Sequence, residues 1–388
     1  MQMNRRSFGK LASAVAIALA ATGAAQAQEV VKIGYTGPLS GGAALYGKNA
    51  LSGIEMAVAE LNAEGFEVGG KKYKFEVVAL DDKYAPSEAA INARRLVQQH
   101  KAPVVMVPHS GGIFALQAFN ERDKFILGAY SSVPSIVERG NKLTLMIPPA
   151  FTGYIEPFIR YETKRFGNKV AIANADHDYA KAWTKAFVPA LEKAGGTIVA
   201  DNPMSYNKST DFYSGVSRVL NGKPDVLFIG GASEPTALVV KQARELGFKG
   251  GFMLMDQAKM DEMARVLGGY DLLEGSIGTL PVAADVREGT KAFVERYRKL
   301  HGADKDPTSE VSLNYTAVHL IAQAMKLAGT VTDVDKIRAQ SDAAAKALAP
   351  ERNPHEINGV RDNGAFEAAV NVAVVQDGKV QQIRLSDL

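Results

Sequence analysis

The sequence predicts an α/β fold of two lobes, each built on a parallel sheet, joined by a hinge. Short apolar segments alternate with helical segments of ten or more residues along most of the chain, which is the pattern of parallel strands with crossover helices. The pattern begins a second time after the proline pair Pro148-Pro149, although the two halves share no sequence repeat. A length of 388 residues agrees with two domains at roughly 150 residues per domain.

Residues 1–27 have the features of a signal peptide. The paired arginines Arg5-Arg6 precede a short apolar core, Leu11–Ala21, and a small-residue cleavage pattern, Ala25-Gln26-Ala27. The core is too short to span a bilayer, and the arginine pair resembles a twin-arginine export signal. The sequence therefore predicts a soluble protein that is exported to the periplasm.

Composition excludes several classes of partner and chemistry. The three basic residues of the signal segment account for the whole excess of 45 basic over 42 acidic residues. A neutral mature chain argues against nucleic acid or an anionic membrane surface as a partner. Cysteine is absent, so thiol catalysis and cysteine-ligated metals are excluded.

Apolar or alternating segments predict five strands in the first half. They are Val30–Tyr35, Lys72–Leu80, Val104–Val107, Phe125–Leu127 and Leu143–Ile147. Helices are expected between them where apolar residues recur at helical spacing. They are Ala43–Glu64, which Gly65 ends, a helix that begins at Pro86, and Ile113–Asn120.

The second half repeats this alternation. Its predicted strands are Val170–Asn174, Thr197–Ala200, Val226–Ile229 and Phe252–Met255, and its predicted helices are Phe151–Phe166, Tyr179–Ala194 and Pro235–Leu246. Then follow the helices Val286–His301 and Ser309–Ala328, a helix end or linker at Ala339–Pro354, and a hairpin that begins with the strand Ala369–Val375.

The proline pair and a second crossing at Gly275–Pro281 divide the chain. They predict a first lobe of residues 28–147 and 280–354, and a second lobe of residues 148–279 and 355–388.

The turn after the third strand is a candidate binding site. Val104–Val107 leads through Pro108 and His109 into Ser110-Gly111-Gly112, where a helix is expected to begin, and the next strand leads to Ser131-Ser132. Ligands bind beyond the carboxyl ends of strands in an open parallel sheet, and free N–H groups at a helix N-terminus attract anions. We interpret this turn as a carboxylate site; the alternative is a serine that only caps the turn.

Other motifs give no sign of catalysis. The glycines between Gly34 and Gly47 do not match G-x-G-x-x-G, and neither a phosphate-binding loop nor a G-x-S-x-G elbow is present. Adjacent residues in Asp176-His177-Asp178 point in alternating directions, which makes them poor ligands for one metal ion. We therefore expect no cofactor, no metal site and no enzyme. Asp256, at a predicted strand end, either pairs with a ligand ammonium group or caps a helix.

Four segments carry a family resemblance: IGYTGPLSGGAALYGKNALSGIEMAVAELNAEGF, LDDKYAPSEAAINARRLV, ILGAYSS, and the stretch from Lys169 to Trp183. They resemble the Leu/Ile/Val-binding family of type I periplasmic solute-binding proteins of ABC importers, and the resemblance covers nearly the whole mature chain. It implies two Rossmann-like lobes that close over a branched-chain or related amino acid. It also implies a monomer that delivers this ligand to an ABC permease in the inner membrane.

The same resemblance implies ligand contacts. Tyr46 matches an aromatic residue against the ligand side chain, and Ser110 lies in the serine-containing turn for the α-carboxylate. Tyr130 and Ser132 lie in the segment that contacts the amino and carboxylate groups. Tyr179 matches an aromatic residue that closes over the ligand, and Asp256, or Gln257 by a shift of one residue, matches the acidic partner of the ammonium. The full candidate set is Tyr46, Ser110, Gly111, Tyr130, Ser131, Ser132, Tyr179, Ser233 and Asp256.

Two departures from the family pattern leave the ligand open. The segment Gly230–Ser233 lacks an aromatic residue often found there, and Ser110 precedes glycines where many members have Ser or Thr. Both changes enlarge the pocket, so an aromatic carboxylate, an amide or another small polar solute is the alternative ligand. A periplasmic ligand-sensing domain and an exported enzyme are the alternative classes of protein.

Overall fold

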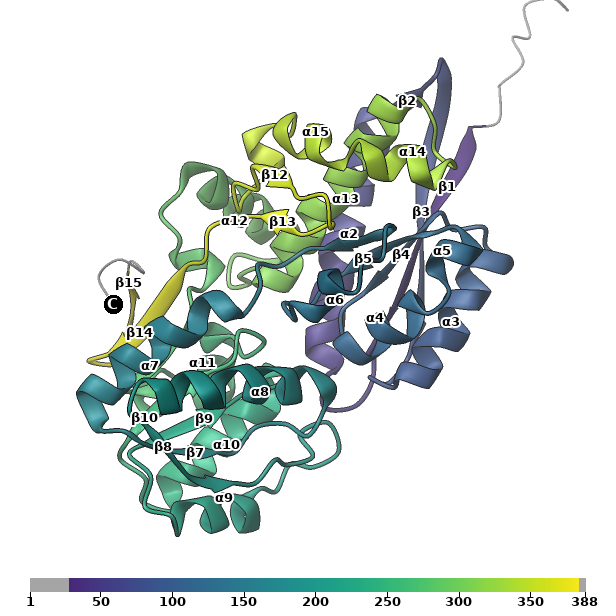
Figure 1. The fold of residues 1–388 in the computed structure, drawn as a ribbon. Coiled ribbons are helices and arrows are strands. Elements are labelled where there is room, and N and C mark those ends of the chain that lie inside the picture. The colour runs from purple at the N-terminus through teal and green to yellow at the C-terminus, as the bar shows by residue number, and fades with distance from the viewer. Residues whose placement is uncertain (1–27, 384–388) are drawn as a thin grey trace, which may run out of the picture.

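The computed structural model describes residues 28–383, so the predicted signal peptide lies outside the described residues. Within them, two sheets each form the centre of a lobe, and the predicted two-lobed α/β fold is confirmed (Figure 1).

The first lobe is built on a six-stranded sheet. In spatial order its strands are β2 (Phe66–Val68), β3 (Lys71–Asp81), β1 (Glu29–Gly37), β4 (Val104–Val107), β5 (Ile126–Ala129) and β6 (Thr144–Met146). All neighbours are parallel except β2, which pairs antiparallel with β3. The carboxyl ends of β4 and β5 therefore lie side by side.

Helices cover both faces of this sheet. α2 (Ala44–Glu64) packs against α13 (Ser309–Ala328), and α3 (Pro86–Gln98) packs against α4 (Ser110–Gln117). Alternate residues of β4 join the two resulting cores, and all four are buried, as expected for a central parallel strand. The other helices of this lobe are α5 (Asn120–Asp123), α6 (Ser135–Glu138), α12 (Glu288–His301), α14 (Val334–Ala339), α15 (Ser341–Lys346) and the 3-10 helix η3 (Pro350–Arg352).

The second lobe is built on a seven-stranded mixed sheet. Its spatial order is β15 (Lys379–Ile383), β14 (Val372–Gln376), β11 (Ser276–Thr279), β10 (Gly251–Leu254), β9 (Val226–Ile229), β7 (Lys169–Ile172) and β8 (Thr197–Asp201). The C-terminal hairpin is antiparallel and the other strands are parallel. The helices are α7 (Thr152–Phe166), α8 (Asp178–Lys193), α9 (Tyr213–Leu220), α10 (Ser233–Glu245), α11 (Met260–Leu267) and the 3-10 helix η1 (Asp271–Leu273).

Three segments connect the lobes. The first contains Pro148-Pro149, the second follows β11 through the 3-10 helix η2 (Val282–Ala284), and the third, residues 368–371, leads into β14. The N–H of Leu280 donates to the carbonyl of Asn371 at 3.1 Å, so the second and third segments are tied together. Figure 1 shows β14 as the yellow strand that returns the chain to the second lobe.

Two features of the structure bear on the predicted lobe boundaries. The segment Gly275–Pro281 contains β11, a central strand of the second sheet, so the crossing begins only after Thr279. The short ribbon β12 (Gly359–Val360) and β13 (Phe366–Glu367) contacts α15, and Ala365 forms a bridge with Met146. We therefore propose that the first lobe extends to about residue 367 rather than ending at 354.

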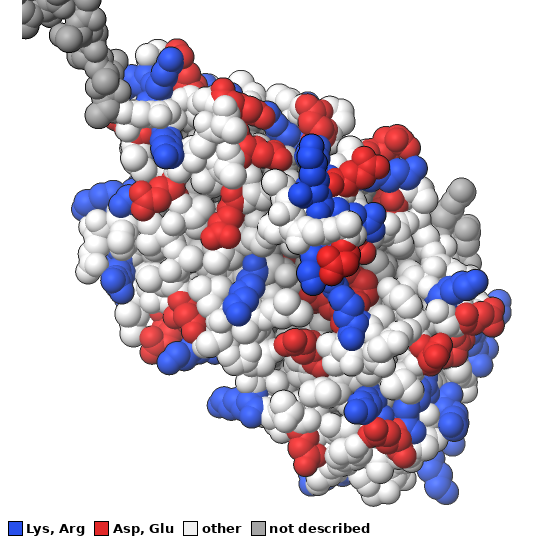
Figure 2. All heavy atoms as spheres, turned by 180° about the vertical axis from the view of Figure 1, so that it is seen from behind, with Lys and Arg blue, Asp and Glu red and all other residues white. Residues whose placement is uncertain are grey.

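Acidic and basic side chains alternate over the surface. Figure 2 shows lysine and arginine interspersed with aspartate and glutamate across one face of the molecule, so the field there is of mixed sign. Among residues 28–383, no helix combines the length and the apolar character that a membrane span requires.

Candidate functional site

A polar pocket lies between the two lobes. Its volume is about 280 Å³, with the opening to solvent included. Seven of the nine candidate residues line it, and Gly111 and Ser233 do not. The complete lining is Tyr46, Tyr84, Pro108, His109, Ser110, Tyr130, Ser131, Ser132, Pro148, Tyr179, Asp256, Gln257, Lys259 and Glu310.

Hydroxyl groups at the ends of β4 and β5 form one wall of the pocket. The side-chain oxygens of Ser110 and Ser131 lie 2.7 Å apart, so one hydroxyl donates to the other. The hydroxyl of Ser132 is buried and has no hydrogen-bond partner among the described residues. This wall therefore offers hydroxyl groups with unused hydrogen-bonding capacity.

The start of α4 differs from the expectation. The helix begins at Ser110 rather than Ile113, because Nδ1 of His109 accepts the N–H of Gly112 at 3.0 Å and caps it. The amide of Gly112 is thus already used and is not free for an anion. The other ring nitrogen of His109 lies 2.9 Å from Asp82, and this buried pair fixes the histidine ring.

The two candidates outside the lining have structural contacts. A Cβ at Gly111 would lie 2.7 Å from Cγ of Pro86 and 3.2 Å from a carboxylate oxygen of Asp178, so the two lobes meet closely there. The hydroxyl of Ser233 accepts the backbone N–H of Lys259 at 3.0 Å. Ser233 therefore supports the loop behind the pocket instead of facing into it.

A connected set of side chains forms the wall of the second lobe. The Tyr179 hydroxyl donates to Oδ1 of Asp256 at 2.5 Å, and the indole N–H of Trp183 donates to the same oxygen at 2.9 Å. The backbone N–H of Gln257 donates to the Tyr179 hydroxyl at 2.9 Å. These bonds fix the Asp256 carboxylate just beyond the end of β10.

Tyrosine hydroxyls around the pocket stay protonated at neutral pH. Burial is the main reason that the pKa values of Tyr46, Tyr130 and Tyr179 are raised well above that of free tyrosine. Each hydroxyl can therefore act as a hydrogen-bond donor.

Sequence reasoning missed two charged residues of the pocket. Lys259 precedes α11 in the second lobe, and Glu310 lies in the first turn of α13 in the first lobe. Their ammonium and carboxylate groups are 3.2 Å apart. Both residues lie at the start of a helix, where charged residues are common. Their sequence pattern therefore does not distinguish a pocket residue from an ordinary surface residue.

Further polar contacts join the lobes around the pocket. The side-chain N–H of Asn49 on α2 donates to the carboxyl of Glu262 on α11 at 2.5 Å. The amide of Gln257 donates to the Tyr84 hydroxyl at 3.3 Å, and the Tyr84 ring lies 5.1 Å from that of His177. The lobes are thus in contact on more than one side of the pocket.

A second cavity of about 550 Å³ adjoins the pocket at the hinge. It shares Tyr130, Pro148, Asp256 and Lys259 with the pocket. Residues of all three connecting segments line it, so its shape depends on the angle between the lobes.

Comparison with known proteins identifies the family. The model of the family described as periplasmic binding protein matches residues 30–379. The chain belongs to the periplasmic binding protein family. An amino acid binding protein of Pseudomonas aeruginosa is 26% identical over 332 residues, which are 84% of this chain and 86% of the relative. A member of this family binds solutes, so the protein is a binding protein and not an enzyme.

Solved structures of the periplasmic binding protein family share the fold. The substrate binding protein of a branched-chain amino acid transporter from Streptococcus pneumoniae, in complex with isoleucine, has a TM-score of 0.76 at 23% identity, covering 92% of this chain and 99% of that chain. The solute binding protein of an ABC transporter from R. palustris, in complex with benzoate, has a TM-score of 0.76 at 18% identity, covering 91% and 95%. One fold thus holds chemically different ligands.

Proposed function

We propose that the protein is the extracytoplasmic solute-binding component of an ABC importer, which captures a branched-chain or related amino acid between its lobes. The observation that carries this proposal is an interlobe pocket that brings serine hydroxyls and a fixed carboxylate together. The named ligands of relatives, amino acids and isoleucine, agree with it.

In this proposal the two walls hold the two charged ends of an amino acid. The hydroxyls of Ser110 and Ser132 donate to the α-carboxylate, and each such charge-assisted bond contributes about 1.5–3 kcal/mol net. Asp256, oriented by Tyr179 and Trp183, accepts the α-ammonium group.

Closure about the hinge then buries the ligand and produces the shape that a permease in the inner membrane recognises. In this proposal the event takes place in the periplasm, which the predicted signal peptide supports. A monomer suffices because one chain contributes both walls.

An aromatic carboxylate without an amine is the second candidate ligand. Tyr46, Tyr84, Tyr130 and Tyr179 give the pocket four aromatic rings, and one structure of the same fold holds benzoate. Such a ligand would use the serine hydroxyls and leave Asp256 without an ionic partner.

A thermal-shift screen of the mature chain, Gln28 to Leu388, tests the proposal, with calorimetry on each hit. Ligand that binds only the folded state raises the melting temperature by mass action. We expect a shift with α-amino acids. A shift with amine-free carboxylates alone would replace the amino acid with the second candidate, and no shift with either group would contradict solute capture at this pocket.

A further inference from the structure

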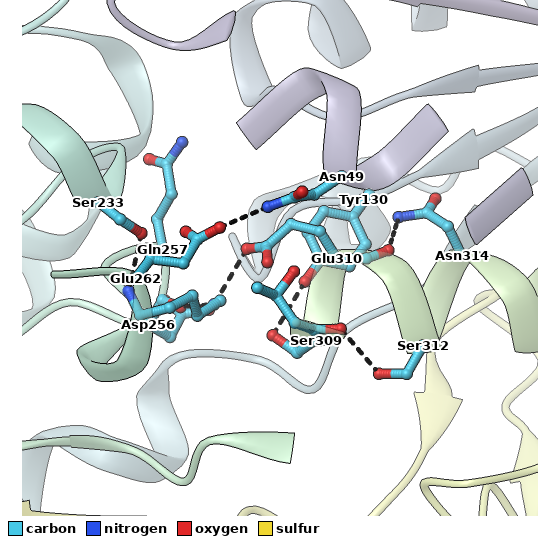
Figure 3. Close-up of polar contacts among 12 residues, drawn as sticks. Asn49, Tyr130, Ser233, Asp256, Gln257, Glu262, Ser309, Glu310, Ser312 and Asn314 are labelled. Atoms are coloured by element: carbon cyan, nitrogen blue, oxygen red, sulfur yellow. Dashed lines mark hydrogen bonds and ion pairs between the residues drawn. The ribbon is translucent and has the colours of Figure 1, made fainter. Parts of the chain in front are cut away.

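The Lys259–Glu310 pair crosses the pocket from one lobe to the other. Figure 3 shows Glu310 projecting from the start of α13 toward the loop that carries Asp256 and Gln257. The ammonium of Lys259 is 3.2 Å from one carboxylate oxygen of Glu310, and the two side chains are only 8% and 1% exposed. Lys259 also donates a hydrogen bond to the backbone carbonyl of Asp256. The pair is therefore desolvated and lies on the pocket surface.

The carboxylate of Glu310 has capacity for further hydrogen bonds in this position. The Lys259 ammonium lies 3.2 Å from one carboxylate oxygen, and the other oxygen accepts no hydrogen bond from the described residues. Asp256, in contrast, accepts two hydrogen bonds on one oxygen. A buried carboxylate without hydrogen-bond donors is strongly disfavoured. An N–H group of a bound ligand would satisfy it.

The charges around Glu310 favour the same kind of ligand group. Asp256 and Glu310 face the pocket with Lys259 as the one lysine or arginine among its lining residues. Behind the pair, burial and the charge of Glu310 raise the pKa of Glu262 to about 8, and burial raises the pKa of Asp261 to about 6. Gln257 adds a side-chain oxygen that also lacks a hydrogen-bond partner among the described residues. Two carboxylates, of Asp256 and Glu310, thus face a single ammonium group among the lining residues of the pocket.

We propose that Glu310 determines ligand specificity by accepting hydrogen bonds from an N–H-bearing side chain of the ligand, in preference to a branched alkyl side chain of the same shape. This inference rests on the proposed function, in which Ser110 and Ser132 hold the carboxylate and Asp256 holds the α-ammonium. A leucine side chain would leave Lys259 as the one group among residues 28–383 that compensates the buried carboxylate of Glu310, whereas an amide or ammonium side chain adds a hydrogen-bond donor.

Titration calorimetry with ligands of matched shape tests this specificity on the unaltered mature chain. Asparagine, leucine and aspartate have nearly the same outline and differ in the side-chain end, which is an amide, two methyl groups or a carboxylate. Lysine against methionine compares an ammonium group with an unbranched side chain that has no N–H group, and lysine against asparagine compares an ammonium group with an amide. We expect asparagine or lysine to bind at least about tenfold more tightly than leucine, methionine and aspartate. The latter three lack one hydrogen bond to a charged group, and such a bond corresponds to about a tenfold change in affinity or more.

Two variants connect this preference to Glu310. Glu310→Leu should reverse the order and favour leucine, and Glu310→Gln should reduce the preference for the N–H-bearing ligand about tenfold or more. Glu288→Gln, on a side chain that is 91% exposed on α12, is the matched control and should change nothing. The affinities of the five amino acids for the unaltered chain test the proposal even if a variant does not fold.

The same measurements distinguish failure of the role of Glu310 from failure of the proposed function. Leucine or methionine binding as tightly as asparagine and lysine, or aspartate binding more tightly than both, would overturn the role of Glu310 and leave the proposed function in place. Binding of none of the five amino acids would remove the amino-acid function and this inference with it.

Discussion

The two walls of the interlobe pocket are built in different ways. In the second lobe, Tyr179, Trp183 and Gln257 form a connected set of hydrogen bonds that holds Asp256 in one position. In the first lobe, the hydroxyl of Ser132 and one carboxylate oxygen of Glu310 are buried without hydrogen-bond partners among residues 28–383.

This difference assigns separate tasks to the lobes. The wall of the second lobe is preorganised, so its carboxylate can bind a ligand group without losing further side-chain entropy. The wall of the first lobe carries groups that lack hydrogen-bond partners until a ligand supplies them. Differences in affinity between ligands should therefore arise mainly at this wall. Substitutions on the two walls should therefore separate affinity from specificity.

The largest expected effect is that of Asp256→Asn. Asparagine preserves the shape and an acceptor oxygen for Tyr179 and Trp183 but removes the charge that pairs with an ammonium. We expect affinity for α-amino acids to fall about 100-fold, as for truncation of a buried charge pair. Calorimetry with an amino acid and its amine-free analogue measures this, and Asp304→Asn, on an exposed side chain, is the control. Equal losses for both ligands would show that Asp256 does not contact the ammonium.

Loss of single hydroxyls in the first lobe should have a smaller effect. We expect Ser132→Ala and Ser110→Ala each to weaken binding about tenfold, because each removes one hydrogen bond to the carboxylate. The fold should be preserved, since neither hydroxyl bonds to the second lobe. Ser217→Ala, at an exposed position of α9, provides the comparison. Unchanged affinity in both pocket variants would eliminate the carboxylate site.

The smallest expected effect concerns stability and pH. Burial, with Glu310 and Asp261 nearby, raises the pKa of Glu262 from 4.5 to about 8, against hydrogen bonds from Ser233 and Asn49 that lower it. The folded state then keeps a proton that the unfolded chain releases near pH 4.5, so this group makes folding less favourable as pH rises from about 4.5 to 8.

Glu262→Gln should remove that dependence while preserving an acceptor for Asn49. Its melting temperature should match the original protein near pH 4.5 and exceed it by a few degrees at pH 8, as measured by scanning calorimetry. Parallel curves for the two proteins over this range would contradict the raised pKa.

Strand ends were the predictable part of the pocket. Ser110, Ser131 and Ser132 follow apolar segments of the kind that form parallel strands, and the carboxyl ends of adjacent parallel strands meet at one edge. Asp256 was predictable for the same reason. The strand β11 was not predicted as a separate element, because Gly275 and Pro281 on either side of it resemble the limits of a linker.

Lys259 and Glu310 could not be predicted from the sequence. They are 51 positions apart, on different lobes, and each stands among other charged residues near a helix start. Only the approach of the two lobes across the pocket brings their charged groups within 3.2 Å. Ser233 and Gly111 were predicted as ligand contacts but do not line the pocket. A small residue at a helix start gives the same sequence signal whether it binds ligand or supports the backbone.

The three connecting segments also determine how the lobes move. Three separate attachments between two rigid bodies suppress twisting and sliding and leave rotation about one axis as the main relative motion, with the bond from Leu280 to Asn371 holding two of them together. A single interlobe distance then describes the whole motion. Because the chain contains no cysteine, two introduced thiols, one on each lobe, would be unique attachment points for a fluorescent pair that reports opening and closing in real time.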